Sequence, residues 1–144
     1  MKNISCYIAL TIVCILVMAG CGGGGDDVVI TPPRASAVMA NTYTPSVAVP
    51  VKLTVDNLTS SVVTAYAVED AVPAGWTVAA ISNSGVFDSV TNKVKWGPFV
   101  GNTPRTLSYS AKPPANATGT VKFNGTLAWD GANITIAGVR EISH

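Results

Sequence analysis

A turn-rich stretch, Val68–Phe99, reads VEDAVPAGWTVAAISNSGVFDSVTNKVKWGPF. Short apolar runs alternate in it with four turn-forming groups: Pro73–Gly75, Asn83–Gly85, Thr91–Lys93 and Gly97–Pro98. Apolar runs bounded by Pro, Gly and Asn in this way are typical of β-strands and hairpins, not of helices. The stretch therefore predicts short strands joined by tight turns at the centre of a β-sandwich, with the last strand pairing ended at Gly97–Pro98.

The residues before this stretch show a two-residue period. Every second residue from position 47 to 55 is apolar: Val47, Val49, Val51, Leu53 and Val55. This pattern predicts a strand with one buried face, in which Pro50 must lie at an edge or face away from a neighbour because it has no N–H. Residues 62–72 are apolar on both faces near Tyr66, which predicts a strand buried between two layers.

The residues after the stretch continue the strand pattern. Leu107, Tyr109 and Ala111 alternate with serines, and a longer run has one apolar face made of Val121, Phe123, Gly125, Leu127 and Trp129. Asp130-Gly131 is a strong hairpin signal, after which Ile134 and Ile136 return along the last strand. Many short strands with turns at such intervals predict an all-β fold, an antiparallel immunoglobulin-like β-sandwich without a disulfide, over residues 36–144.

Residues 1–20 have the three parts of a secretory signal peptide. Lys2 gives a positive start, Ile4–Met18 is almost wholly apolar, and Ala19-Gly20 precedes Cys21. An uncleaved membrane anchor is the alternative, but the apolar run is short against the roughly 20 residues that a spanning helix needs. Ordinary secretion without lipid is a further alternative.

The sequence Val17-Met18-Ala19-Gly20-Cys21 resembles the lipobox of bacterial lipoproteins. The resemblance implies that Cys21 is joined to diacylglycerol, that the signal peptide is removed before it, and that the new amino group is acylated, for example by palmitate. Met18 departs from the leucine usual in that family. Gly22, where an aspartate would favour retention in the inner membrane, implies the outer membrane or the cell surface.

Residues 21–35 are predicted to be a flexible tether between the lipid and the sandwich. Glycines and Asp26-Asp27 cannot build a core, and Pro32-Pro33 stiffens the end of the segment. Cys6 and Cys14 leave with the signal peptide and Cys21 is consumed by the lipid. The mature protein is therefore expected to form no disulfide and to hold no thiolate metal site or other cofactor.

The chain is poor in charge. Charged residues make up 12% of it, about half the typical share of ~25%, and the formal net charge is +1. A surface with so little net charge does not attract nucleic acid. The single histidine, His144, is the last residue, which argues against a Ser-His-Asp triad and against histidine metal sites. We therefore expect no enzymatic activity.

Two groups of side chains are candidates for a functional site. Glu69, Asp70 and Asp88 could serve a calcium site or a glycosidase, but we expect one of the first two to accept hydrogen bonds from the Pro73–Gly75 turn. The aromatic residues could form a platform for a sugar; its members would be Trp76, Trp96, Trp129 and Tyr66. The tryptophans lie in phase with apolar neighbours, which favours a place in the core.

The sandwich region resembles the Ig-like modules of exported bacterial multidomain and adhesin-type proteins. The residues that carry the resemblance are V-E-D-x-x-P-x-G-W-x-V and K-V-K-W-G-P-F, followed by R-x-L-x-Y. It implies a β-sandwich with an accessory role and no catalytic residue. The expected function is a lipid-anchored, non-enzymatic module of the cell envelope that binds a protein partner. A surface carbohydrate-binding module is the alternative.

Overall fold

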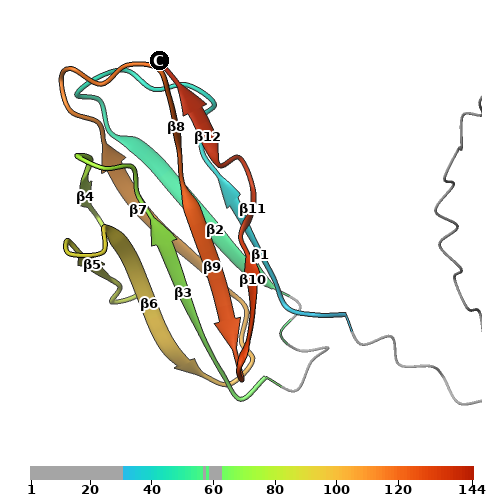
Figure 1. The fold of residues 1–144 in the computed structure, drawn as a ribbon. Coiled ribbons are helices and arrows are strands. Elements are labelled where there is room, and N and C mark those ends of the chain that lie inside the picture. The colour runs from blue at the N-terminus through green and yellow to red at the C-terminus, as the bar shows by residue number, and fades with distance from the viewer. Residues whose placement is uncertain (1–30, 57, 59–62) are drawn as a thin grey trace, which may run out of the picture.

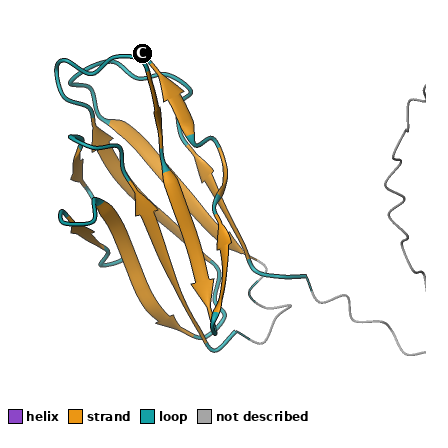
Figure 2. Ribbon diagram, in the orientation of Figure 1, coloured by secondary structure: helices purple, strands orange, loops and turns teal. Residues whose placement is uncertain are grey.

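The computed structural model of the chain describes residues 31–56, 58 and 63–144. The predicted signal peptide, Cys21 and most of the predicted tether lie outside these residues. Within them Figure 2 shows strands and loops but no helix. The strands are β1 (Arg34–Val38), β2 (Val49–Asp56), β3 (Ala65–Ala71), β4 (Thr77–Ala79), β5 (Val86–Asp88), β6 (Lys93–Val100), β7 (Arg105–Lys112), β8 (Thr120–Lys122), β9 (Asn124–Trp129), β10 (Ala132–Thr135), β11 (Ala137–Gly138) and β12 (Glu141–Ser143).

Ten strands form two five-stranded sheets (Figure 1). The first sheet has the strand order β11-β1-β2-β7-β4, and the second has the order β10-β9-β3-β6-β5. β8 and β12 form a separate pair at the C-terminal end. Pairing between strands is antiparallel except for β1 with β11. Side chains from both large sheets meet in one hydrophobic core. The predicted all-β antiparallel β-sandwich is confirmed.

β2 follows the predicted alternation. Its buried positions are Val49, Val51, Leu53 and Val55. Val47, which the pattern placed in the same strand, lies before β2 and is exposed. Pro50 lies opposite Ser110 of β7, past Lys52, where the pairing of β2 with β1 ends. In the described part of the chain β2 therefore has a single neighbour at Pro50, as expected for a residue that lacks an N–H.

β3 alternates, so the expectation that it is buried on both faces is wrong. Tyr66, Val68 and Asp70 are buried, whereas Ala67 and Glu69 are half-buried. The second sheet packs against the first on one face only, and its other face borders solvent over the described residues. Small side chains such as Ala67 fit such an open face without creating a large apolar patch.

Trp76 and Trp96 lie in the core, where their phase placed them. Trp76 is 4% exposed and contacts the rings of Tyr43 and Phe123, with centroids 5.2 and 5.6 Å away. Trp96 is 2% exposed, and its indole N–H donates to the carbonyl of Ser82 at 2.9 Å. A Cβ at Gly85 would lie 2.3 Å from the Trp96 indole nitrogen, so the turn at 83–85 needs glycine there.

The Gly97–Pro98 pair does not end the pairing, contrary to the sequence prediction. β6 continues to Val100 and pairs with β3 along its length, with a register shift between Tyr66 and Val68. Gly97 has a φ of 98°, and a Cβ there would lie 2.9 Å from the Tyr66 carbonyl oxygen. The register shift absorbs the irregular residues, so the strand bends instead of stopping.

Three other boundaries differ from the prediction. β1 begins at Arg34, two residues before the expected domain start. The expected strand from 121 to 129 is split at Phe123, whose N–H donates to the Arg140 carbonyl at 2.8 Å. The last strand is divided into β10, β11 and β12 because it changes partner from β9 to β1 and then to β8. Tertiary partners, not local composition, set these breaks.

The Asp130-Gly131 hairpin forms as predicted. Trp129 pairs with Ala132, and the two turn residues have φ values of 40° and 87°. Positive φ at both central residues is the requirement of a type I′ turn. The Asp130 carboxylate also accepts hydrogen bonds from the backbone N–H groups of Thr64 and Ala65, at 2.8 and 3.2 Å. The turn is thus fastened to the start of β3.

Candidate functional site

A buried polar cluster joins three segments that are distant in sequence: β3, β7 and the residues between β11 and β12. Asp70 of β3 is completely buried and accepts a hydrogen bond from the Tyr109 hydroxyl of β7 at 2.8 Å. Arg140, between β11 and β12, donates to both oxygens of the same carboxylate. The cluster therefore ties both sheets and the C-terminal segment to one carboxylate.

Neighbouring residues hold the Arg140 side chain and leave room for the Asp70 carboxylate. Arg140 also donates from Nε to the Phe123 carbonyl at 3.2 Å and lies 5.9 Å from the Phe123 ring. A Cβ at Gly125 would lie 2.8 Å from the Asp70 carboxylate, so only glycine leaves room for the acid at that position. The Arg140 side chain is 11% exposed. Its outer side borders a cleft of about 430 Å³, lined by Lys122, Phe123, Asn124, Thr135, Gly138, Arg140 and Glu141.

The electrostatics of the cluster suit a structural clamp. Burial raises the pKa of Asp70, against the opposing effects of Arg140 and the Tyr109 hydroxyl. Burial and the negative charge of Asp70 raise the pKa of Tyr109, so its hydroxyl keeps its proton and acts as a donor. The carboxylate thus receives donors from two side chains, and neither Asp70 nor Tyr109 is left as a free base or nucleophile.

Neither acid of the Glu69-Asp70 pair binds the Pro73–Gly75 turn, so that prediction is wrong. Asp70 faces the core, because its phase in β3 matches that of Val68. Glu69 faces outward and forms an ion pair with Lys93 at 2.7 Å. The turn closes through its own backbone, by a hydrogen bond from the Trp76 N–H to the Pro73 carbonyl at 3.2 Å.

Asp88 binds its own turn. Its carboxylate accepts hydrogen bonds from the N–H groups of Val90 and Thr91, at 2.9 and 3.2 Å, and from the Thr91 hydroxyl at 2.7 Å. The Lys95 ammonium donates to the same carboxylate at 2.7 Å. The Lys95 hydrogen bond first, and then those from Thr91, hold the pKa of Asp88 well below its ordinary value of 3.8.

We expect Asp88→Asn to lower stability at neutral pH but not in acid. A depressed pKa in the folded state gives stability that is present above the ordinary pKa and is lost as pH falls through the folded value. The difference between wild type and Asp88→Asn should therefore shrink steadily below pH 3.8. Urea midpoints measured at a series of pH values from neutral to strongly acid would show this. A difference that stays constant over that series would contradict it.

The four members of the aromatic platform do not share an open face. Tyr66 and Trp129 are paired in register between β3 and β9, but on the face of the second sheet that turns toward the first. Tyr66 is buried and donates to the Thr103 carbonyl at 2.8 Å, and Trp129 is half-buried. Trp76 and Trp96 are buried elsewhere in the core. The structure thus brings together one pair, Tyr66 and Trp129, and both residues line a hollow at the β9–β10 hairpin.

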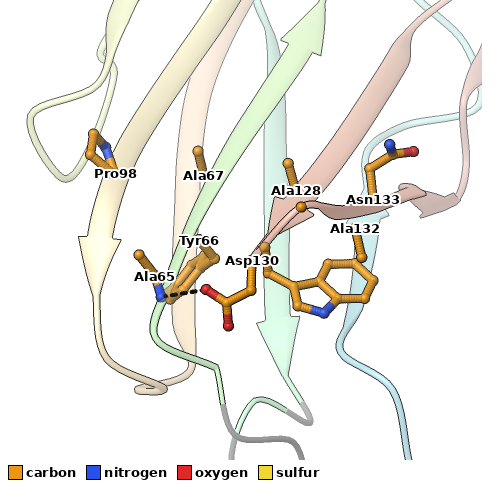
Figure 3. Close-up of a pocket in the computed structure, with 10 residues that line it drawn as sticks. Ala65, Tyr66, Ala67, Pro98, Ala128, Asp130, Ala132 and Asn133 are labelled. Carbon is orange, nitrogen blue, oxygen red and sulfur yellow. Dashed lines mark hydrogen bonds between the residues drawn. The ribbon is translucent and has the colours of Figure 1, made fainter.

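Shallow hollows mark the outer face of the second sheet. Figure 3 shows one, of about 330 Å³, around the β9–β10 hairpin and Pro98, with Asp130 bound to Ala65. A second hollow of about 410 Å³ extends toward Glu69. The two share Ala67, Ala128 and Asn133, so they form one trough with a floor of small side chains. No local sequence pattern indicates this trough, because its lining residues come from four strands, β3, β6, β9 and β10.

The described residues add three further facts. Among residues 31–56, 58 and 63–144, no group of three His, Cys, Asp or Glu side chains could hold a metal ion. Over the same residues no helix has the length and apolarity to cross a membrane. His144 packs beside Tyr43, with ring centroids 5.7 Å apart. Cys21, the predicted lipidation site, lies outside the described residues.

No protein-family model matches the chain, and no curated protein matches it. Two solved structures of the GH20 exo-β-N-acetylglucosaminidase of Vibrio harveyi, one of an inactive mutant and one in complex with N-acetylglucosamine, are similar at 12% sequence identity and a TM-score of 0.38. The similarity covers 79% of this chain and 19% of each enzyme chain. Likeness at this level carries no inference about activity or ligand.

Proposed function

We propose that the protein is a lipid-anchored, non-enzymatic component of the cell envelope, at the outer membrane or cell surface, that acts as an accessory or protein-interaction module. The observation that carries the proposal is the sequence Val17–Cys21 after an apolar segment, ahead of a sandwich that begins at Arg34. Several acyl chains on Cys21 would hold the protein firmly, since one chain alone gives only marginal binding. The segment between Cys21 and Arg34 would space the sandwich from the bilayer.

The fold supports an interaction role in preference to catalysis. The buried Asp70 cluster is satisfied by its own donors, and Glu69, Asp88 and Glu141 pair with lysines. What the sandwich offers to other molecules is therefore its sheet faces and strand edges, which is how many β-domains bind. The burial of Trp76 and Trp96 does not favour the alternative of a carbohydrate-binding module.

Cys21→Ala is expected to abolish lipid attachment and release the protein from membranes. The thioether to diacylglycerol forms on the cysteine sulfur, so alanine leaves no acceptor. Metabolic labelling with a radioactive or alkyne fatty acid, followed by membrane fractionation, would show loss of label and of membrane association. Globomycin, which blocks the lipoprotein signal peptidase, should cause the wild-type precursor to accumulate.

Cys14→Ala is the matched control, because Cys14 lies in the segment predicted to be removed. It should label and fractionate like wild type. If Cys21→Ala left both processing and membrane association unchanged, the proposed lipid anchor would be wrong.

A further inference from the structure

The four outer edges of the two sheets differ in how they are protected. The loop that follows β4 covers the part of the β7 edge that β4 leaves open. In this loop the Ser82 N–H donates to the Ser108 carbonyl at 2.9 Å, and the Asn83 side-chain amide donates to the Thr106 carbonyl at 3.0 Å. β5 has three residues, and its Asp88 forms an ion pair with Lys95 of β6. β11 has two residues, one of them glycine. Charges, proline, shortness and covering loops are the usual protections of a strand edge.

β10 has fewer of these protections, and with four residues it is the longest of the four edge strands. Its four residues, Ala132–Thr135, contain no charge, proline or glycine, and three of them are exposed. Within the described residues no strand pairs with its outer side. In a two-residue hairpin the two residues next to the turn exchange backbone hydrogen bonds. The backbone N–H and C=O groups of Ala132 and Ile134 therefore point toward β9. The bond from the Ile136 N–H to the Gly125 carbonyl, at 2.9 Å, continues that alternation.

The backbone groups of Asn133 and Thr135 therefore point away from β9. Two N–H donors and two carbonyl acceptors at this spacing fit an extended strand. A second copy of the same edge fits them in an antiparallel arrangement. With the two-fold axis at Ile134, Asn133 of each copy lies opposite Thr135 of the other, and the two Ile134 side chains, each half-buried now, meet on the inner face. No like charges oppose each other in this register.

The position of the tether also favours a second copy. Ser36 pairs with Ala137, and a hollow of about 380 Å³ between them and β10 is lined by Arg34, Ala35, Ser36, Asp56, Ile134, Thr135 and Ala137. The chain thus enters β1 beside the β10 edge (Figure 1). A two-fold axis normal to the sheet keeps both entry points on one side of the joined sheets. A segment from 21 to 33, which can span at most about 45 Å at 3.3–3.6 Å per residue, could then reach one membrane from each copy.

We propose that β10 is a self-association edge, through which two membrane-anchored copies join their second sheets into one continuous sheet. The proposal rests on the proposed lipid anchor, because four backbone hydrogen bonds make a weak contact and confinement to a membrane raises the effective concentration of the edge. The partner is a second copy of this chain, held by Asn133 and Thr135 backbone groups and by the Ile134 pair.

Disulfide trapping of Ile134→Cys in the full-length chain tests the proposal. In the predicted register the two Ile134 residues form a non-hydrogen-bonded pair, with Cα atoms about 4.5 Å apart, inside the range of about 4.4–6.8 Å that a disulfide accepts. Oxidation of bacterial membranes with copper phenanthroline should convert most of this variant to a covalent dimer on a non-reducing gel. Val86→Cys, which is exposed on the opposite edge of the same sheet, should stay monomeric.

A charge exchange in the Ile134→Cys background adds a second test without disturbing the core. Asn133→Lys with Thr135→Lys places like charges opposite each other twice and should lower the trapped dimer several-fold. Asn133→Lys with Thr135→Glu places opposite charges there and should restore it. The proposal is overturned if Ile134→Cys gives no more dimer than Val86→Cys, or if the two charge variants behave alike.

The wild-type chain separates this proposal from the lipid anchor. With Cys21 consumed by lipid, wild type has no free thiol and should give no covalent dimer. A dimer of the wild type that Cys21→Ala removes would show an unmodified Cys21 and would contradict the lipid anchor. A trapped Ile134→Cys dimer that persists with Cys21→Ala would still support the edge.

Discussion

Trp96→Ala is expected to lower the free energy of unfolding by about 3–5 kcal/mol, as buried Trp-to-Ala changes do. The indole is almost completely buried, packs 5.9 Å from the Tyr109 ring and donates to the Ser82 carbonyl. Alanine would leave a cavity between the sheets and remove one of the two hydrogen bonds that the Ser82 carbonyl accepts, leaving the one from the Gly85 N–H at 3.1 Å. The free energy of unfolding of a domain of this size is only about 5–15 kcal/mol. The variant would therefore lose a large share of its stability. Urea unfolding followed by fluorescence of the remaining tryptophans measures the loss.

Val86→Ala is the control for this variant, because Val86 is 61% exposed and lies on β5, the neighbour of β6. Surface changes of this kind stay within about ±0.5 kcal/mol. If Trp96→Ala kept the stability of Val86→Ala, Trp96 would not be a core residue, and a binding role for the stretch Val68–Phe99 would have to be considered again.

Arg140→Ala is expected to be as damaging, at about 3–5 kcal/mol, because removing one partner of a buried ion pair leaves the other charge uncompensated. The Asp70 carboxylate would keep only the Tyr109 hydroxyl as a side-chain donor. The C-terminal segment would also lose its hydrogen bond to the Phe123 carbonyl. Urea unfolding gives the loss, and hydrogen exchange of residues 136–144 should show that this segment opens more readily.

The double variant Asp70→Leu with Arg140→Met is the matched comparison. Apolar residues of similar volume often replace a buried ion pair at little cost. We expect this variant to be more stable than Arg140→Met alone and than Asp70→Leu alone. If the double variant lost the sum of the two single losses, the two side chains would act independently, and the clamp described for Asp70 and Arg140 would be wrong.

The sequence sufficed to predict features that depend on neighbours along the chain. Alternation located the buried face of β2, and Asp130-Gly131 located a type I′ turn whose positive φ values few other residue pairs tolerate. The phase of Trp96 with Val94 placed its ring in the core. In each case the decisive interaction is local or follows from the two-residue period of a strand.

Features that depend on distant partners were missed. Gly97–Pro98 predicts a strand end because proline cannot join a regular ladder, yet one extra residue of β6 between Trp96 and Phe99 shifts the register with β3 and lets β6 continue. The break at Phe123 exists because its backbone N–H donates to the carbonyl of Arg140, which lies later in the chain. Local composition has no trace of either partner.

The Asp70 cluster lay between these two cases. Tyr109 and Arg140 are 39 and 70 residues away from Asp70 in sequence, so the cluster could not be assembled from spacing. One signal was present, however. Asp70 has the same phase as Tyr66 and Val68 in an apolar strand, which places an acid on a buried face and implies that it has partners there. The expectation that the acid binds a nearby turn overlooks this phase.

The central claim, a sandwich carried on a lipid at Cys21, is tested most directly by mass spectrometry of the protein purified from membranes. The N-terminal peptide of the mature protein should begin at Cys21 and carry a diacylglycerol thioether and an amide-linked acyl chain. A mature N-terminus at any other residue, or an unmodified Cys21 thiol, would contradict the account.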